Sequence, residues 1–292
     1  MSGGMGGMGG GPGGAAAPRE ARQPCVLVFS GADPSGGAGI AADILAIHAQ
    51  GAHALPVITA LTVQDNDRVY EVMPVEPEAL LRQARALTAK MAIRAVKIGI
   101  TGSAANARAI AQVIAELRAR ADIPVVLDPV LASGHGDLLS RDDAAQALGA
   151  LLPLATMITP NGPEAAALAA TLAGAAGAGD GVPGGAADHA QARLHAQALL
   201  DAGCRHVLIT GGHGKGDTVI NRWFSANQGQ SWSWQRLPGA YHGSGCTLAA
   251  TIAGLLAYGY PVAQALVRAQ GYTHRALAAA YAIAPGQLIP QR

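Results

Sequence analysis

The stretch Val26-Leu-Val-Phe-Ser30, followed by Gly31-Ala-Asp-Pro-Ser-Gly-Gly-Ala-Gly39, sets the pattern for the whole chain. Its first part is a short apolar run without polar alternation, which predicts a strand buried on both faces. The glycine-rich part leads into a helix, for which Ile40, Ile44 and Ile47 supply the expected apolar face. A buried strand joined to a helix in this way is the unit from which parallel α/β sheets are built.

The same unit recurs along the chain. Further β-branched runs predict buried strands at Ala54 to Thr59, Ala95 to Ile98, Val125 to Asp128, Thr156 to Thr159 and Val207 to Thr210. Apolar residues at helical spacing follow Pro77 (Leu80, Ala84, Leu87 and Met91) and Ser103, a possible cap (Ile110, Val113, Ile114 and Leu117). Strands separated by helices pair in parallel, so we expect a mostly parallel sheet with helices on both faces.

The last third of the chain departs from this alternation. Alternating residues at Val219 to Phe224 and Ser231 to Leu237 flank Asn227-Gln-Gly229, which predicts an antiparallel hairpin at the sheet edge. Two helices, Thr247 to Tyr258 and Val262 to Tyr281, are expected after it. The fold class is therefore α/β, with a central sheet that is antiparallel only at its edge.

Composition excludes several classes of protein. Half of the 292 residues are hydrophobic and 13% are charged, which is ample apolar material for a core and unlike a disordered chain. The net charge of +1 gives no field for a nucleic acid partner. The apolar runs are too interrupted for a transmembrane helix, so no membrane partner is expected. Three scattered cysteines suit a reducing cytoplasm, where we expect the protein to reside.

Two segments are expected to lie outside the packed fold. Residues 1–24 are rich in Gly, Met and Ala without apolar periodicity, which predicts a disordered tail, and glycine does not form the apolar core of a secretory signal. Residues 173–188 form a second low-complexity stretch, interpreted as a flexible surface insertion, with an active-site flap as the alternative. Residues 25–292 then form a single domain.

Four motifs follow strands, where ligands bind in parallel α/β sheets. In the first, Gly31 to Gly39, small residues allow a ligand close to a helix N-terminus. A rival interpretation is that Gly37, Gly39 and Ala42 form a dinucleotide fingerprint. That fingerprint begins at the strand end, however, and here several residues intervene. A tight turn without a ligand is the third possibility.

The second and third motifs carry amides and carboxylates. Gln64 follows the strand that starts near Val57, and its amide offers a donor and an acceptor to an aminopyrimidine edge, unless it is a solvated loop residue. Asn161-Gly-Pro-Glu164 begins a helix. Its amide and carboxylate, one turn apart, suit a hydrated Mg²⁺, although a helix cap with an acidic first turn is an equally good local explanation.

The fourth motif is Gly243-Ser-Gly-Cys246, at the start of a predicted helix. Glycines before a helix leave N–H groups free at the positive end of its dipole, which favours an anion. Cys246 would lie in the first turn, where we expect a lowered thiol pKa and hence a thiolate that takes a proton from an alcohol. A buried structural cysteine is the alternative.

Taken in order, these motifs closely resemble the hydroxymethylpyrimidine/phosphomethylpyrimidine kinases of thiamine biosynthesis, in the ribokinase-like superfamily. The resemblance covers roughly Cys25 to Ala280. Its segments are Ser30 to Asp43, Val57 to Leu61 with Gln64, Lys97-Ile-Gly99, Asp128-Pro-Val130, Thr159-Pro-Asn161 with Glu164, Gly211-Gly-His213, and His242-Gly-Ser-Gly-Cys-Thr247.

The resemblance implies an ATP-dependent phosphotransferase that converts a pyrimidine alcohol to its monophosphate and then to the diphosphate. It also implies Mg²⁺ and a homodimer. The residues that it implies in substrate binding are Gln64, Asp43, Gly31, Ile100 and Val130. Those implied in binding ATP are Asn161, Glu164, Thr210 and Gly212, with Glu164 holding Mg²⁺ through water. Those implied in catalysis are the anion hole Gly243, Ser244 and Gly245, and Cys246 as the base.

The chain departs from this family where relatives carry lysines. Thr210 replaces one of them, Gln270 lies near another, and Ala240 and Tyr241 stand where relatives have Asn-Thr. Lys215 or Arg268 could compensate. The alternatives are therefore a pyridoxal kinase, a paralogue that phosphorylates one pyrimidine species, a non-catalytic vitamer-binding protein, and a nicotinamide oxidoreductase.

Overall fold

A single nine-stranded sheet runs through the computed structural model, which describes residues 1, 23–132, 139, 144–174 and 186–292. The strand order is β3-β2-β1-β4-β5-β6-β7-β8-β9. The strands are β1 (Cys25–Ala32), β2 (His53–Gln64), β3 (Val69–Pro74), β4 (Ile93–Ile98), β5 (Val125–Leu127), β6 (Met157–Ile158), β7 (His206–Ile209), β8 (Thr218–Ser225) and β9 (Gly229–Gln235). Neighbours from β2 through β7 pair in parallel, and β3, β8 and β9 pair antiparallel at the edges.

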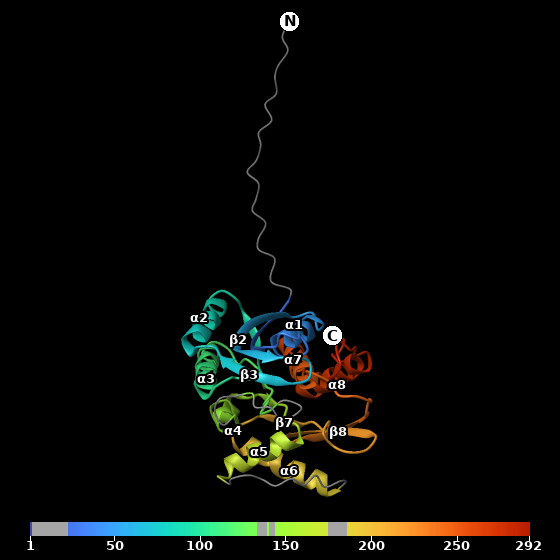
Figure 1. The fold of residues 1–292 in the computed structure, drawn as a ribbon. Helices are drawn as coiled ribbons and strands as arrows, with labels where there is room; N and C mark the ends of the chain where they lie inside the picture. The colour runs from blue at the N-terminus through green and yellow to red at the C-terminus, as the bar shows by residue number, and fades with distance from the viewer. Residues whose placement is uncertain (2–22, 133–138, 140–143, 175–185) are drawn as a thin grey trace.

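Helices cover both faces of this sheet (Figure 1). One layer holds α1 (Gly39–His48), α7 (Ser244–Ala257) and α8 (Val262–Ala278), and the other holds α2 (Pro77–Thr88), α3 (Ala104–Arg118), α4 (Ala144–Ala147), α5 (Gly162–Leu172) and α6 (Ala186–Asp201). The predicted α/β class, with a mostly parallel sheet, helices on both faces and an antiparallel edge hairpin, is confirmed. Within the described residues, no helix has both the length and the apolar composition needed to cross a membrane.

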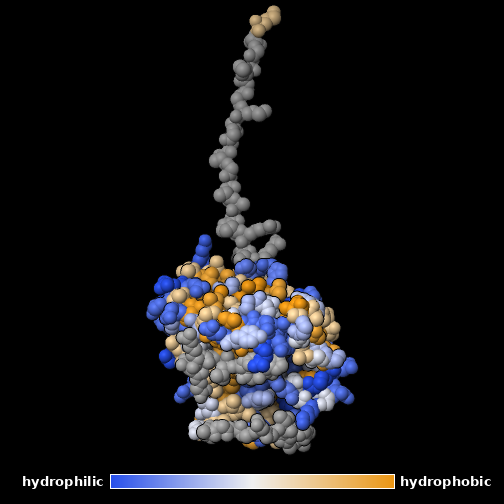
Figure 2. Space-filling model, in the orientation of Figure 1, coloured by the Kyte–Doolittle hydropathy of each residue, from blue (hydrophilic) through white to orange (hydrophobic). Residues whose placement is uncertain are grey.

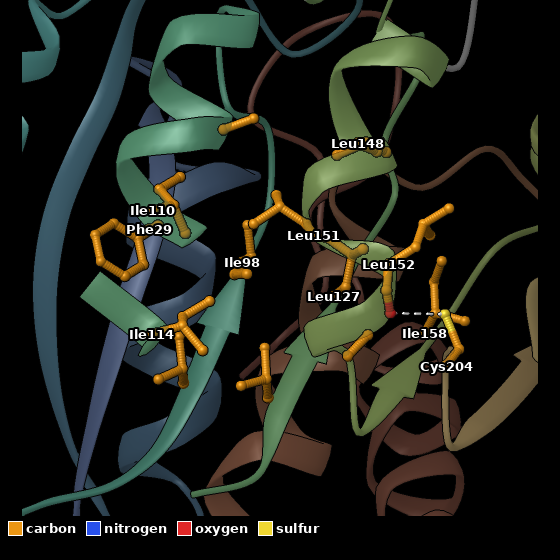
Figure 3. Packing of buried hydrophobic residues seen from close by; sticks show 14 of the residues in the cluster. Phe29, Ile98, Ile110, Ile114, Leu127, Leu148, Leu151, Leu152, Ile158 and Cys204 are labelled. Carbon is orange, nitrogen blue, oxygen red and sulfur yellow. Dashed lines mark hydrogen bonds between the residues drawn. The ribbon is translucent and has the colours of Figure 1, made fainter. Parts of the chain in front are cut away.

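Two apolar cores hold these layers together, one on each face of the sheet. Figure 3 shows the larger one, where Phe29 and Ile98 of the sheet meet Ile110 of α3. Farther along the same core, the Cys204 thiol donates a hydrogen bond of 3.3 Å to the carbonyl of Leu152. Burial raises the pKa of Cys204 to about 12, so this cysteine is a neutral packing residue.

The structure corrects several details of the predicted elements. The apolar face of α1 is rotated from the one predicted, because Ala42, Ala46 and Ile47 are buried while Ile44 is 37% exposed. The small alanines of this face pack against α7. The edge strand β3 was not predicted, since its side chains are mostly half-buried and lack a clear alternation. Met91 lies beyond the end of α2 and is exposed.

The two low-complexity segments lie mostly outside the described residues, which leave out residues 2–22 and 175–185. Residues 186–188, at the end of the predicted insertion, belong to helix α6, which begins at Ala186.

Candidate active site

A cavity of about 350 Å³ opens at the carboxyl ends of the central strands. The loop after β1, the end of β2, the loop after β7 and the N-terminus of α7 all contribute to its wall. All of the predicted site residues except Asp43 line it: Gly31, Gln64, Ile100, Val130, Asn161, Glu164, Thr210, Gly212, Gly243, Ser244, Gly245 and Cys246. Parallel pairing places these distant segments together, because the six parallel strands, β1, β2, β4, β5, β6 and β7, all end at the same edge of the sheet.

The N-terminus of α7 has the geometry expected of an anion site. Gly243 adopts a left-handed conformation with φ of 75°, and a Cβ there would collide with the carbonyl oxygen of Gly37. The amide of Thr247 is bonded to the carbonyl of Gly243 at 2.9 Å, so the helical ladder starts at that residue. The preceding amides of the first turn, from Ser244 to Cys246, have no partner within the helix, and all three residues line the cavity.

Cys246 does not have the lowered pKa that was predicted. The surrounding protein raises the pKa of the thiol to about 12, chiefly by desolvation, although Lys97 favours the charged form. The expected effect of the helix N-terminus is therefore outweighed by burial. The Cys246 thiol lies near the Asp128 carboxyl and lowers its pKa, and the backbone of Gly39 lowers the pKa of the thiol, but burial outweighs both effects.

Asp128 lies directly beneath the anion site. Its Oδ1 is 3.7 Å from the place where a Cβ of Gly245 would stand, and it accepts a 3.3 Å bond from the Thr159 hydroxyl. Burial raises the pKa of this carboxyl, although Lys97 opposes the shift. The sequence contained this residue only as part of a resemblance motif at the end of β5. Its polar character at the end of a buried strand was the signal that could have identified it.

Asp43 was predicted to bind substrate, but the structure places it outside the cavity. It is fully buried and accepts a 2.8 Å salt bridge from Lys97 Nζ, which is also fully buried. Helix α1 turns Asp43 toward the sheet, since the other side of the helix faces solvent. Asp43 and Lys97 therefore form a buried ion pair below the site, and in this structure Asp43 has no access to a ligand.

Gln64 lies beside Asp33, several strands across the sheet from residues 210–217. These residues follow β7 and are called the nucleotide loop here because the resemblance implies that Thr210 and Gly212 bind ATP. The Gln64 side chain lies near enough to the Asp33 carboxyl to lower the pKa of that group. Oδ2 of Asp33 also accepts a bond of 2.8 Å from His242 Nε2. Sequence reasoning missed Asp33 and His242, although both stand within the quoted motifs, because nothing in their spacing shows that the two loops meet.

Asn161 and Glu164 form a reciprocal capping box at the start of α5. The Asn161 side chain accepts a bond of 2.9 Å from the Glu164 amide, and Glu164 Oε2 accepts one of 2.8 Å from the Asn161 amide. The local cap explanation is therefore correct, and it does not conflict with ligand binding because both residues line the cavity. Burial, with a contribution from nearby Asp128, raises the pKa of Glu164 to about 8. Among the described side chains, no group of three or more His, Cys, Asp or Glu is arranged to hold a metal.

Neutral groups occupy the positions where relatives were expected to have lysines. Gln270 is 3% exposed, and its Oε1 accepts bonds from Asn221 at 2.9 Å and Trp234 at 3.1 Å. Asn221 in turn accepts a 3.0 Å bond from the amide of Gly211, at the start of the nucleotide loop. A neutral network thus supports this loop where a cation was expected.

Neither cation proposed as a replacement lines the cavity. Arg268 lies over the ring of Tyr260 at 4.8 Å, and Lys215 is exposed. Arg236 instead reaches the nucleotide loop, where it donates bonds of 2.7 Å to the carbonyl of Gly212 and 2.6 Å to that of Gly216. Sequence reasoning missed this residue because it lies on the far strand of the hairpin.

The dinucleotide interpretation of the first glycine loop does not fit the structure. A Cβ at Gly37 would collide with the ring of His242 and lie 2.6 Å from Ile289 Cδ1. Gly37 allows its loop to pack directly against His242 and Ile289, and these side chains occupy the space that a pyrophosphate at Gly37 would need. The close approach instead joins this loop to the N-terminus of α7.

Comparisons with known proteins agree with this geometry. The family model described as phosphomethylpyrimidine kinase matches residues 33–290. The hydroxymethylpyrimidine/phosphomethylpyrimidine kinase of Rhizobium meliloti is 37% identical over 89% of this chain and 93% of its own length.

Solved structures have the same architecture. The phosphomethylpyrimidine kinase of Clostridium difficile superposes with a TM-score of 0.71 at 29% identity, covering 87% of this chain and 100% of that one. The pyridoxal kinase of Bacillus subtilis, solved as an ADP complex, superposes with a TM-score of 0.77 at 25% identity, covering 92% and 97%.

Proposed function

Because this chain belongs to the phosphomethylpyrimidine kinase family, we propose that its cavity phosphorylates 4-amino-5-hydroxymethyl-2-methylpyrimidine and then the resulting monophosphate. The protein is an ATP-using phosphotransferase of the ribokinase-like fold, and its reaction supplies the pyrimidine half of thiamine. The residue roles, Mg²⁺ and the order of the two transfers are part of the proposal.

The observation that carries the proposal is the shared cavity of Gln64 and the α7 N-terminus. Gln64 offers an amide to a ring with an amino substituent, while Ile100 and Val130 supply apolar wall for the ring itself. The amides at Ser244 to Cys246 offer N–H groups to a phosphoryl group. One end of the cavity thus suits a heteroaromatic ring and another suits an anion, as an alcohol kinase requires.

The α7 amides stabilise the negative charge on the phosphoryl group during transfer, because phosphoryl transfer depends mainly on positioning and electrostatics. The raised pKa of Cys246 argues against a resting thiolate. We therefore assign Cys246 a relay role. Its sulfur accepts the hydroxymethyl proton while the thiol proton passes to the Asp128 carboxylate, whose raised pKa favours accepting it.

Glu164 is the residue that would hold Mg²⁺. Its carboxyl lines the cavity without a cationic partner among its principal interactions, and its raised pKa shows that its charge is poorly compensated. Mg²⁺ binds proteins through one or two carboxylates and keeps several waters, so a single carboxylate near the nucleotide loop fits the ion. When bound, the ion would neutralise charge on the nucleotide phosphates.

A homodimer is also part of the proposal. Figure 2 shows apolar side chains gathered on the upper part of one face. Leu61 and Val63 of β2 and Tyr70 of β3 are large side chains exposed at this edge of the sheet. Clustered apolar side chains at a sheet edge are typical of a protein interface. Sedimentation equilibrium would measure the mass of the assembly in solution.

The experiment that tests the function is ADP release with Mg²⁺ and each of three substrates: the hydroxymethylpyrimidine, its monophosphate and pyridoxal. We expect turnover of both pyrimidines and little turnover of pyridoxal. Gln64→Ala should raise KM for both pyrimidines about tenfold or more, since it removes the ring's polar contact. Gln83→Ala is the matched control, because Gln83 is exposed on α2.

Each alternative gives a different result. Preferred turnover of pyridoxal would identify a pyridoxal kinase, and turnover of one pyrimidine alone would identify a specialised paralogue. Thermal stabilisation by the ligand without ADP release would identify a binding protein. Unchanged kinetics in Gln64→Ala would remove Gln64 from the ring site.

A further inference from the structure

Gln287 lines the cavity, and the proposed function leaves it without a role. It belongs to the C-terminal segment that follows α8, and only 7% of it is exposed. The Asn66 side chain donates a bond of 3.1 Å to the Gln287 carbonyl and one of 3.3 Å to the carbonyl of Pro285. Gln287 is thus held against the loop that directly follows Gln64, at the part of the cavity assigned to the substrate ring.

The backbone on either side of Gln287 is fixed. Gly286 has a positive φ of 121°, and a Cβ there would lie 2.9 Å from Cβ of Asp67, so the two segments approach this closely only with glycine. On the other side, the Leu288 carbonyl accepts a 2.9 Å bond from the His242 amide. Residue 287 therefore stands between the loop after β2 and the loop before α7, with little backbone freedom.

The orientation of the Gln287 amide follows from its contact with Asp67. Nε2 donates a hydrogen bond of 3.4 Å to the carbonyl oxygen of Asp67, and a carbonyl oxygen can only accept. The reverse orientation would bring two oxygens together. Among the described residues, no donor is bonded to Gln287 Oε1. A ligand that fills the cavity would leave this oxygen unpaired unless the ligand itself donates to it.

Asp33, a carboxylate in the same part of the wall, is already satisfied by the protein. It accepts bonds from the Ser35 amide and hydroxyl, from the Ala38 amide and from His242 Nε2. A carboxylate has about four lone-pair sites, and these donors occupy them. Gln287 Oε1, in contrast, is an acceptor that still lacks a donor.

We propose that Gln287 is a second specificity-determining residue of the ring site, whose Oε1 accepts a hydrogen bond from a primary amino group on the substrate ring. The inference rests on the proposed function, which places an aminopyrimidine beside Gln64. A primary amino group carries two N–H donors, whereas the Gln64 amide has one oxygen, so a second acceptor is needed to pair both. Sites built to hydrogen-bond a substrate N–H reject analogues that lack it, because a buried polar group is then left unpaired.

The test compares wild type with Gln287→Met, which keeps the length of the side chain and removes the amide. The two substrates are the 4-aminopyrimidine alcohol and its 4-methylamino analogue, which has one N–H fewer. The measured quantity is the ratio of their kcat/KM values, taken from ADP release. We expect wild type to prefer the primary amine, and this preference to fall about tenfold or more in Gln287→Met.

Gln291→Met is the matched control, because Gln291 belongs to the same C-terminal segment but is exposed and does not line the cavity. Its ratio should equal that of wild type. A wild type without the preference, or an unchanged ratio in folded Gln287→Met, would overturn the inference.

A second variant covers the case in which Gln287→Met does not fold. Gln287→Ala removes the same acceptor without adding apolar bulk to the cavity wall, and it should lose the preference to the same extent. The wild-type ratio in Gln287→Ala would again overturn the inference. If wild type releases no ADP with the amino substrate, the proposed function fails, and the ratio of the two calorimetric Kd values then decides the role of Gln287.

Discussion

At the scale of single residues, burial decides the chemistry of this site. Cys246 stands in the first turn of α7, where a helix dipole lowers a thiol pKa, yet the pKa is raised to about 12. Burying the thiolate away from water costs more free energy than the helix dipole and Lys97 together contribute to stabilising it. The thiol is thus neutral in the resting protein, and in the proposed relay the nearby Asp128 carboxyl is the group that receives its proton.

This leads to a prediction for Cys246→Ala. The first transfer needs the hydroxymethyl proton removed, whereas the second begins from a phosphate that is already an anion. We expect kcat of the first transfer to fall about 100-fold, the usual scale of general acid–base catalysis, and that of the second to fall far less. Single-turnover rates with each pyrimidine measure both, and Cys246→Ser, which keeps a relay group, should lie between. Equal losses in both transfers would exclude the relay.

At the scale of elements, helix termini and strand ends assemble the site. Asn161 and Glu164 are hydrogen-bonded to one another in the capping box of α5, and Gly243 is the N-cap residue of α7 and has a left-handed backbone conformation. Both ends face the cavity because each helix follows a strand or loop at the same edge of the sheet. The same cap holds the half-buried Glu164 carboxyl in the cavity wall, so the charge state of Glu164 depends on how α5 begins.

Glu164 therefore predicts how stability depends on pH. Its pKa in the folded protein is about 8, above the reference value of 4.5. A raised carboxyl pKa means that the folded state holds the proton more tightly, so stability is lost as pH rises through that range. Glu164→Gln keeps the acceptor for the Asn161 amide without the charge. In melts without metal or nucleotide, we expect wild type to lose Tm relative to the variant between about pH 5 and pH 9.

The expected difference at the higher pH is about 2 °C or more. Glu78→Gln is the control, because Glu78 is also a first-turn acid but lies on α2 away from the cavity. Parallel Tm curves for Glu164→Gln and wild type would contradict the raised pKa.

At the scale of the whole molecule, the segment from Pro285 to Arg292 ties the loops of the site together. The carbonyls of Pro285 and Gln287 accept bonds of 3.3 and 3.1 Å from the Asn66 side chain, close to Gln64. Farther along, Arg292 donates to the carbonyl of Gly37 at 2.6 Å and to that of Gly243 at 3.3 Å. This C-terminal segment thus holds two parts of the cavity wall, the loop after Gln64 and the start of α7 at the anion site.

Arg292 does not line the cavity, so Arg292→Ala should loosen the anion site without removing a contact to the ligand. Its guanidinium also donates a 2.8 Å bond to the Thr247 hydroxyl, and bonds from charged groups contribute about 1.5–3 kcal/mol. We expect Tm to fall by about 3 °C or more and both transfers to slow by similar factors. Calorimetry and steady-state rates measure these changes, with Arg268→Ala as the control on α8. A selective loss of only one transfer would argue for direct contact with a substrate instead.

Local pattern alone determined the α/β class, the positions of every strand except β3, several of the helices, and the Asn161 and Gly243 motifs, because periodicity and turn chemistry act over a few residues. Contacts between distant residues decided the rest. Asp43 forms a salt bridge with Lys97, and burial raises the pKa of the Cys246 thiol instead of lowering it. Asp33 is hydrogen-bonded to His242 and lies near Gln64. Burial and charge pairing depend on which segments meet, and only the packed sheet brings them together.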